Sequence, residues 1–246
     1  MTKASLPPPF PADCRMVVFD LDGTLYRQSR LRRAMLVQLL TAGGPGKLAR
    51  VRDLRIFRHL REQASDAGQA GFEAALYAEA ARRTGRGEAA MRALVQDWME
   101  ERPLPHLRAA RVAGTAELFA ALRARGIVVA VWSDYPVKAK LAALGLTADH
   151  MLAATDAEVA ALKPNPRGLS LLLERTGLDA AQVLMVGDRM ERDGAAAAAL
   201  GVAFLLRAAK GPDGVARVAD FAALARMVEA SAVQGRTVQA SVVQGS

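Results

Sequence analysis

Cysteine, aromatic residues and long apolar runs are scarce or missing in this chain of 246 residues. Cys14 has no second cysteine to pair with, so an internal disulfide is excluded and a reducing compartment is favoured. No apolar run is long enough to cross a membrane, and the N-terminal residues MTKASLPPPFPADCR lack the apolar segment of a secretory signal. We therefore predict a soluble, cytoplasmic protein without membrane insertion.

The composition allows a large core and favours an anionic partner. Aromatic residues make up 5% of the chain and hydrophobic residues 52%, so most of the core is expected to consist of alanine, leucine and valine. The formal net charge of +8 suits phosphorylated metabolites, nucleic acid or a membrane surface. The charge alone does not choose among these three.

Apolar runs and glycine breaks predict alternating strands and helices in most of the chain. Residues 16–20 form a short β-branched run followed by the turn signal LDGT, as expected for a buried parallel strand. The same reasoning predicts further strands at 127–133, 150–154, 183–187 and 202–206, with helices at 115–125, 137–144, 167–176 and 194–200. Repeated strand–helix units predict an α/β fold with a parallel sheet and helices on both faces.

Residues 29–101 interrupt this alternation with a purely helical pattern. Helical spacing of apolar positions predicts four helices, at 31–40, 48–60, 72–81 and 89–99. Pro103 and Pro105 are expected to end this section. We predict a flexible leader at 1–14 and a core in two parts, at 15–26 and 105–228. An inserted helical cap is predicted at 27–104, and a disordered tail with a short repeat at 229–246.

Two aspartates stand at the end of the first predicted strand. Residues two apart in an extended backbone point the same way, so Asp20 and Asp22 can face one site beyond the strand. Open α/β sheets bind ligands at that edge, and two carboxyl groups there can act as nucleophile and as acid. Gly23 permits the sharp exit and Thr24 can fix it by hydrogen bonds. An ordinary Asp-Gly turn is the alternative.

Further polar residues follow other predicted strands. Ser133 ends one strand, Asp188 follows another, and Asp193 lies at the start of the next predicted helix. Lys163 lies in ALKPNP, where the prolines keep the chain extended. Taken singly, these residues suit helix caps or a solvated charge. Their joint placement at the carboxyl ends of strands favours one site, and the aspartates offer the hard oxygen ligands that Mg²⁺ prefers.

The motifs resemble those of the haloacid dehalogenase superfamily, and within it the phosphatases with a helical cap, such as phosphoglycolate phosphatases. The similarity covers about residues 15–210 and rests on FDLDGTL (19–25), VWSD (131–134), KPNP (163–166) and VGDRMERD (186–193). The resemblance implies an α/β fold with a Rossmann-like parallel-sheet core and an inserted α-helical cap.

The resemblance also implies roles for individual residues. Asp20 is then the nucleophile, and Asp22 protonates the leaving alcohol and later activates water. Ser133 and Lys163 hold the transferring phosphoryl group, to which the backbone amide of Asp134 can also donate. Mg²⁺ is expected on Asp20, on the backbone carbonyl of Asp22 and on Asp188, with Asp193 as a further ligand or as a support for the water shell of the ion. These roles agree with the need of phosphoryl transfer for charge neutralisation and positioning.

Basic residues are concentrated in the first part of the predicted cap, where Asp53 is the only acid between residues 27 and 61. A solvated helix face is one interpretation. Alternatively, some of these arginines, for example Arg30, Arg33 or Arg55, recognise an anionic substrate with their planar guanidinium groups. His59 is expected to be an ordinary surface residue. In the fourth motif, Arg189 can pair with Glu191 or contact the substrate, and the pair with Glu191 is the expected arrangement.

We therefore predict a magnesium-dependent phosphatase that hydrolyses a small phosphomonoester, a phosphorylated metabolite, through an aspartyl-phosphate. A sugar phosphomutase of the same fold is an alternative, and so is a basic nucleic-acid or membrane-surface binding protein that retains a hydrolase fold. Nucleic acid is disfavoured because Phe57 is the only aromatic residue within the basic stretch. A dehalogenase is disfavoured because carbon–halogen cleavage does not need the acid that Asp22 supplies. The oligomeric state is left open.

Overall fold

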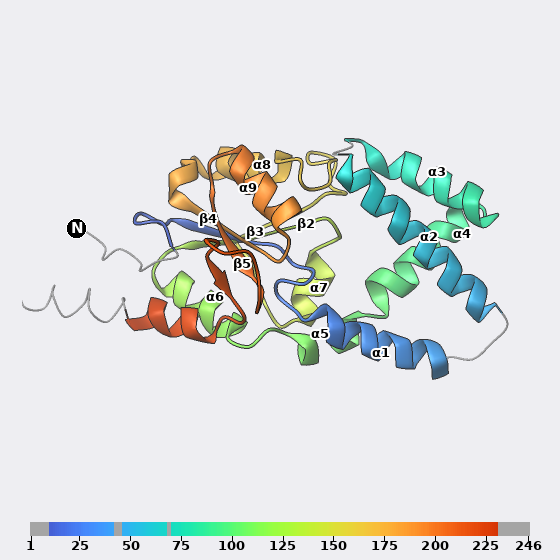
Figure 1. Ribbon diagram of the computed structural model, residues 1–246, viewed down its shortest axis with the longest axis horizontal. Coiled ribbons are helices and arrows are strands. Elements are labelled where there is room, and N and C mark those ends of the chain that lie inside the picture. Colours follow the sequence, from blue (N-terminus) through green and yellow to red (C-terminus); the bar gives the residue numbers. More distant parts are fainter. Residues whose placement is uncertain (1–9, 42–45, 68–69, 231–246) are drawn as a thin grey trace, which may run out of the picture.

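A parallel sheet of six strands forms the centre of the molecule (Figure 1). The computed structural model describes residues 10–41, 46–67 and 70–230. The strand order is β3-β2-β1-β4-β5-β6. The strands are β1 (Met16–Phe19), β2 (Val128–Ser133), β3 (His150–Ala153), β4 (Val183–Gly187), β5 (Ala203–Arg207) and β6 (Arg217–Val218). All neighbouring pairs are parallel, which confirms the predicted α/β fold.

The direction of winding changes next to β1. Phe19 of β1 is in register with Val131 of β2 on one side and with Val186 of β4 on the other. The chain adds β2 and β3 on the first side, and β4, β5 and β6 on the second. In a doubly wound sheet, such a switch point leaves a crevice at the carboxyl ends of the strands. The fold therefore places a ligand site beyond the ends of β1 and β4.

The two faces of the sheet are covered by different helices. Met16 and Val18 of β1 pack in one apolar cluster with α8 (Arg167–Thr176) and α9 (Ala195–Ala199). Val17 and Phe19 point the other way, into a cluster that includes residues of α6 (Thr115–Ala124) and α7 (Lys138–Ala143). This alternation follows from the period of two along a strand. Short turns, η2 (Ala180–Gln182) and η3 (Met190–Gly194), precede β4 and α9.

A group of helices between β1 and β2 lies at one end of the sheet (Figure 1). Phe57, Phe72 and Met91 are fully buried in an apolar cluster of this insert. The insert contains α1 (Gln28–Thr41), α2 (Lys47–Asp66), α3 (Phe72–Thr84), α4 (Glu88–Val95), the π-helical turn η1 (Gln96–Glu101) and α5 (Leu104–Ala110). The four helices predicted in this section are confirmed. Among the described helices, none has both the length and the apolar character to cross a membrane.

Helix α5 corrects one prediction. Pro103 and Pro105 do not end the helical section, because α5 begins between them at Leu104. A proline in the first turn of a helix is tolerated, since the N–H group that it lacks would have no partner there. The two residues therefore mark the start of a helix.

The ends of the chain also differ from the prediction. The predicted leader is described from residue 10, and its last part packs on the core: Phe10 and Cys14 are buried. Beyond the last predicted strand, the chain adds β6 and a helical segment at 222–230. Leu224 and Val228 of this segment are buried in the core, as is Phe221 just before it. Most of the predicted tail, residues 231–246, lies outside the described residues.

Candidate active site

Asp20 follows directly after β1, in the crevice at the switch point. Its backbone N–H donates to the carbonyl of Val186 over 2.8 Å, which fixes the residue between β1 and β4. The Lys163 ammonium lies 2.6 Å from Oδ1, and the Thr24 hydroxyl donates to Oδ2 over 2.9 Å. The whole residue is buried, with 6% of its surface exposed. Asp20 is therefore held in one orientation at the end of the strand.

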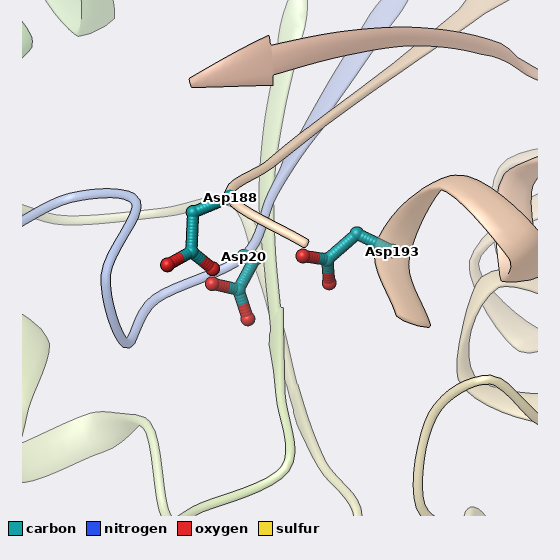
Figure 2. A group of neighbouring side chains, drawn as sticks. All are labelled: Asp20, Asp188 and Asp193. Carbon is teal, nitrogen blue, oxygen red and sulfur yellow. The ribbon is translucent and has the colours of Figure 1, made fainter. Parts of the chain in front are cut away.

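Three carboxylates meet at this point (Figure 2). One oxygen each of Asp20, Asp188 and Asp193 lies within 4.8 Å of the others. Asp188 follows β4, and Asp193 lies in η3, where its Oδ2 accepts from the N–H of Arg189 over 3.1 Å. Lys163 also contacts Asp193, with 2.7 Å between Nζ and Oδ1. The carboxyl ends of β1 and β4 thus bring together residues that are far apart in sequence.

A close backbone approach makes room for this cluster. Gly23 has φ +103°, and a Cβ atom at this position would lie 2.0 Å from Oδ2 of Asp188. Both the positive φ and the contact exclude a larger residue without displacement of the carboxylate. The turn after Asp22 therefore requires glycine for two independent reasons.

The cluster carries more negative charge than its one ammonium group neutralises. Burial raises the pKa of Asp20 well above its ordinary value; the attraction of Lys163 works against this, and repulsion by Asp193 and Asp188 adds to it. Burial, with repulsion by Asp193, raises the pKa of Asp188 to about 6. Burial would lower the pKa of Lys163, but the attraction of Asp193 and Asp20 outweighs it and raises that pKa. Buried hard oxygen ligands that repel one another fit a divalent cation such as Mg²⁺.

The Asp22 carboxylate is not part of this cluster and is bound by three donors. Lys140 Nζ lies 2.6 Å from Oδ1, and the Tyr26 hydroxyl donates to the same oxygen. The Ser133 hydroxyl donates to Oδ2 over 3.0 Å. Burial alone would raise the pKa of Asp22, but Lys140, Tyr26 and Ser133 outweigh it and hold the pKa below its ordinary value. In this conformation, Asp22 is therefore an ionised carboxylate that can accept a proton.

The residues predicted to hold a phosphoryl group surround the same crevice. Ser133 ends β2 and is fully buried, and its Oγ accepts from the N–H of Tyr135 over 3.1 Å. The Asp134 carboxylate accepts from the backbone N–H of Lys163 over 3.0 Å. The Asp134 side chain thus orders the loop that carries Lys163. The structure brings all the site residues predicted from the sequence to the carboxyl ends of β1, β2 and β4.

Several residues at the site were not predicted. Tyr26 and Lys140 bind Asp22, and Lys140 lies on α7, where the sequence pattern indicates only a helix. Arg207 donates to the carbonyl of Gly23, and its charge offsets part of the rise in the pKa of Asp188 that burial and Asp193 cause. Arg207 ends β5, so its place at the carboxyl end of a strand could have identified it from the sequence.

A cavity of about 520 Å³ opens beside Asp22, between the core and the helical insert. Among the arginines considered from the sequence, Arg55 lines this cavity, whereas Arg30 and Arg33 are not among its lining residues. Arg189 also lines it and pairs with Glu191, with 3.0 Å between Nε and Oε1, as predicted. The insert therefore contributes basic residues to the space next to Asp22.

Comparisons with known proteins agree with this geometry. The model of the haloacid dehalogenase-like hydrolase family matches residues 14–201. No curated protein shows a significant sequence similarity to the chain. The structure is similar to that of the HAD-hydrolase YfnB from Bacillus subtilis bound to magnesium, with a TM-score of 0.62 and 14% identity over 87% of this chain and 98% of that one.

Two further solved structures are similar to about the same extent. A 2-haloacid dehalogenase from Pseudomonas syringae pv. Tomato DC3000 has a TM-score of 0.58 and 19% identity, over 87% of this chain and 98% of that one. A predicted phosphoglycolate phosphatase from Haemophilus somnus 129pt has a TM-score of 0.56 and 19% identity, with the same two coverages. At these identities, the similarity shows the fold and does not distinguish a phosphatase from a dehalogenase.

Proposed function

Because the chain belongs to the haloacid dehalogenase-like hydrolase family, we propose that it is a magnesium-dependent phosphatase. It hydrolyses a small phosphomonoester through an aspartyl-phosphate on Asp20. The observation that carries this proposal is the meeting of three carboxylates within 4.8 Å of one another, with Lys163 beside two of them. Such a cluster could hold a metal ion, which together with Lys163 would supply the positive charge that a phosphate ester requires.

Asp20, Asp188 and Asp193 would hold the metal ion with their carboxylates, and the backbone carbonyl of Asp22, which here accepts from Nε2 of Gln28 over 3.1 Å, would be the fourth ligand. When bound, Mg²⁺ supplies positive charge that neutralises both the phosphate oxygens and the attacking carboxylate. The donor set fits because it consists of buried carboxylate oxygens, the ligand type that Mg²⁺ prefers. The structural relative YfnB, which was crystallised bound to magnesium, lends further support.

In the first step, the Asp20 carboxylate attacks phosphorus. A bond forms between an Asp20 oxygen and phosphorus while the bond from phosphorus to the ester oxygen breaks, and the leaving alcohol takes a proton from Asp22. The Lys163 ammonium, 2.6 Å from Oδ1 of Asp20, orients this carboxylate and neutralises charge beside the transferred group. Thr24 binds the second oxygen and keeps the carboxylate plane fixed.

In the second step, water attacks the aspartyl-phosphate. The Asp22 carboxylate accepts the proton of this water, phosphate leaves, and Asp20 is regenerated as a carboxylate. Asp22 then carries the proton that the next leaving alcohol needs, so the two steps balance. The contacts of Asp22 with Lys140, Tyr26 and Ser133 favour its ionised form, which is the form that activates water.

Asp22 also favours a phosphatase over a dehalogenase. Alkoxide leaving groups need a proton, whereas a halide leaves without one, so an acid two residues after the nucleophile serves ester cleavage only. The carboxylate cluster also favours a phosphatase. Asp188 and Asp193 lie beside Asp20 and repel it, an arrangement that a bound metal ion would stabilise. Phosphate esters that bind through a metal ion make use of this arrangement.

We also propose that the helical insert, predicted at residues 27–104 and continued by α5 to Ala110 in the structure, is a cap that governs which ester is accepted. Ser65 of α2 donates to the carbonyl of Lys163, and Arg61 of α2 donates to the carbonyl of Asp134. Both acceptors are backbone groups of core residues at the site. The cap lines the cavity beside Asp22, where it can exclude water and strengthen charged contacts.

A pair of release assays tests the proposed function. The purified chain is incubated with Mg²⁺ and a panel of phosphorylated metabolites, and separately with 2-haloacids, and released phosphate and halide are measured. We expect phosphate release that stops when a chelator is added and resumes with Mg²⁺. Halide release without phosphate release would show that the chain is a dehalogenase.

A further inference from the structure

Helix α2 presents a basic face to the cavity. The residues of α2 that line the cavity recur at helical spacing: Val51, Leu54, Arg55, Arg58, Arg61, Glu62 and Ser65. Phe57 and Leu60 lie on another face and belong to the apolar cluster of the insert. A helix that packs on one side and faces a cavity on the other separates its residues in this way. The basic residues of α2 are therefore divided between the cavity and other surfaces.

The C-terminal end of α2 is fixed at the catalytic centre. Ser65 donates to the carbonyl of Lys163, and the ammonium of Lys163 contacts Asp20 over 2.6 Å. From Ser65, the helix leads away from the centre towards its N-terminal end. With a rise of about 1.5 Å per residue, Arg58 and Arg55 lie roughly 10 and 15 Å along the helix axis from Ser65. Residues of α2 thus lie at increasing distances from the reacting phosphate.

Most cations that line the cavity already have partners. Arg61 contacts the rings of Phe72 and Tyr135 in addition to the carbonyl of Asp134. The other engaged pairs are Lys140 with Asp22, Arg32 with Gln28, Arg189 with Glu191, and Arg192 with Asp66. The charge of each of these residues is therefore already partly engaged by a protein group.

Arg55 and Arg58 are different. Both are exposed towards the cavity, and neither makes a hydrogen bond or an ion pair with any of the residues that the structure describes. Glu62, the acid on the same face of α2, lies one turn nearer the centre, where its charge acts on Arg189. Two neighbouring guanidinium groups without an acid of their own form a site for an anion.

We propose that Arg55 and Arg58 bind a second anionic group of the substrate. This inference rests on the proposed phosphatase function and names the substrate class: an extended phosphomonoester that carries another phosphate or carboxylate two to three helical turns from the phosphate that reacts. The planar fork of arginine suits either group. Esters with two or three carbons are too short to reach both the catalytic centre and this pair.

The same cavity suggests a competing outcome. Leu31, Met35 and Leu54 also line it, so an extended ester could be recognised by its apolar chain without a second charge. The two possibilities predict opposite orders of kcat/KM for esters of equal length that end in a charged or in an apolar group. A test must therefore hold chain length constant while it changes the terminal charge.

A matched series of alkyl esters makes this separation. Initial rates of phosphate release with Mg²⁺ are measured for bisphosphates of the linear diols from propanediol to octanediol, and for the monophosphates of the alcohols of equal length. The readout is the ratio of kcat/KM for bisphosphate over monophosphate, corrected for the two equivalent ends of each bisphosphate. This ratio is determined for the wild type, R55Q, R58Q and R33Q, the last of which replaces an exposed arginine that does not line the cavity.

We expect the ratio to rise with chain length and to reach about tenfold or more in the wild type, the usual effect of a charged hydrogen bond. R58Q and R55Q should lower the ratio towards unity, whereas R33Q should leave it unchanged. A ratio near unity at every length, or an equal response in R33Q, would overturn the assignment. Phosphate release from none of these esters or from the metabolite panel would contradict the phosphatase function itself, which is a separate result.

Discussion

The ammonium nitrogen of Lys140 lies 2.6 Å from Oδ1 of Asp22, and both side chains are largely buried beside the cavity. The contact joins α7 to the loop after β1. It keeps Asp22 ionised before substrate binds, because attraction by Lys140 outweighs the effect of burial on the pKa of Asp22. In the proposed mechanism, Asp22 therefore holds the proton that it gives to the leaving alcohol only while its side chain is away from Lys140.

Asp22→Asn tests this role. The amide can neither donate a proton to the alcohol nor accept one from water, so we expect kcat to fall by about 10² to 10⁴, the usual range for a general acid or base. The loss should be larger for an alkyl phosphate than for nitrophenyl phosphate, whose leaving group needs no proton. Asp213→Asn, at an exposed position that does not line the cavity, is the control. An equal loss for both esters would argue against the acid role.

The stability of Asp188→Asn, first measured without metal, tests whether Asp188 belongs to the metal site. The pKa of Asp188 is raised to about 6 by burial and by Asp193, so the folded chain holds a proton there more tightly than the unfolded chain does. The stability of the metal-free wild type should then fall as pH rises from about 4 to 6. In chelator at neutral pH, we expect the variant to be more stable by about 1–3 kcal/mol in urea unfolding.

Addition of Mg²⁺ should reverse this order. The ion stabilises the wild type by binding to the folded state, and the variant has lost one of its ligands. The variant should also need more Mg²⁺ for half-maximal phosphate release. Equal stability of the two proteins in chelator, together with equal gains from Mg²⁺, would show that Asp188 is not a ligand.

Gly23→Ala, compared with Gly85→Ala, separates the effect of contact with Asp188 from the effect of backbone strain. Both Gly23 and Gly85 have positive φ, at +103° and +72°, but an added Cβ meets Asp188 at Gly23 and meets nothing within 4 Å at Gly85. We expect both alanine variants to lose about 1 kcal/mol of stability from the left-handed backbone. Only Gly23→Ala should weaken Mg²⁺-dependent phosphate release, because it displaces Asp188. A similar loss of activity in Gly85→Ala would exclude this explanation.

Arg61→Met tests the contact between the cap and the core. Arg61 is buried, lies over the rings of Phe72 and Tyr135, and donates to the carbonyl of Asp134. Loss of a charged hydrogen bond and of the ring contacts should reduce the free energy of unfolding by about 2 kcal/mol. Arg58→Met, on the same helix but without such contacts, should change it by less than about 0.5 kcal/mol. Equal stabilities of the two variants would contradict a structural role for Arg61.

The sequence predicts the core well because its signals are local. Residues 183–187 form a continuous apolar run that ends in glycine, and the structure has β4 over the same residues. Asp20 ends one predicted strand and Asp188 follows another, and parallel strands place their carboxyl ends at one edge of the sheet. Proximity of residues that are far apart in the chain could therefore be predicted from strand ends alone.

Features that depend on packing could not be predicted in this way. Lys140 lies in a helix with ordinary spacing, and only the docking of α7 beside the loop after β1 brings it to Asp22. Among the cap arginines, Arg55 and Arg58 are distinguished from Arg33 only by which face of a helix meets the cavity. The helical segment at 222–230 is a different case, since Phe221, Leu224 and Val228 have the spacing of a buried helix face.

The most direct test of the proposed mechanism is the rate of Mg²⁺-dependent phosphate release by Asp20→Asn. The amide has nearly the shape of the carboxylate but is a poor nucleophile, so the folded variant should release no phosphate above background. Asp213→Asn, purified in parallel, should keep the wild-type rate. Release by Asp20→Asn near the wild-type rate would contradict nucleophilic attack by Asp20.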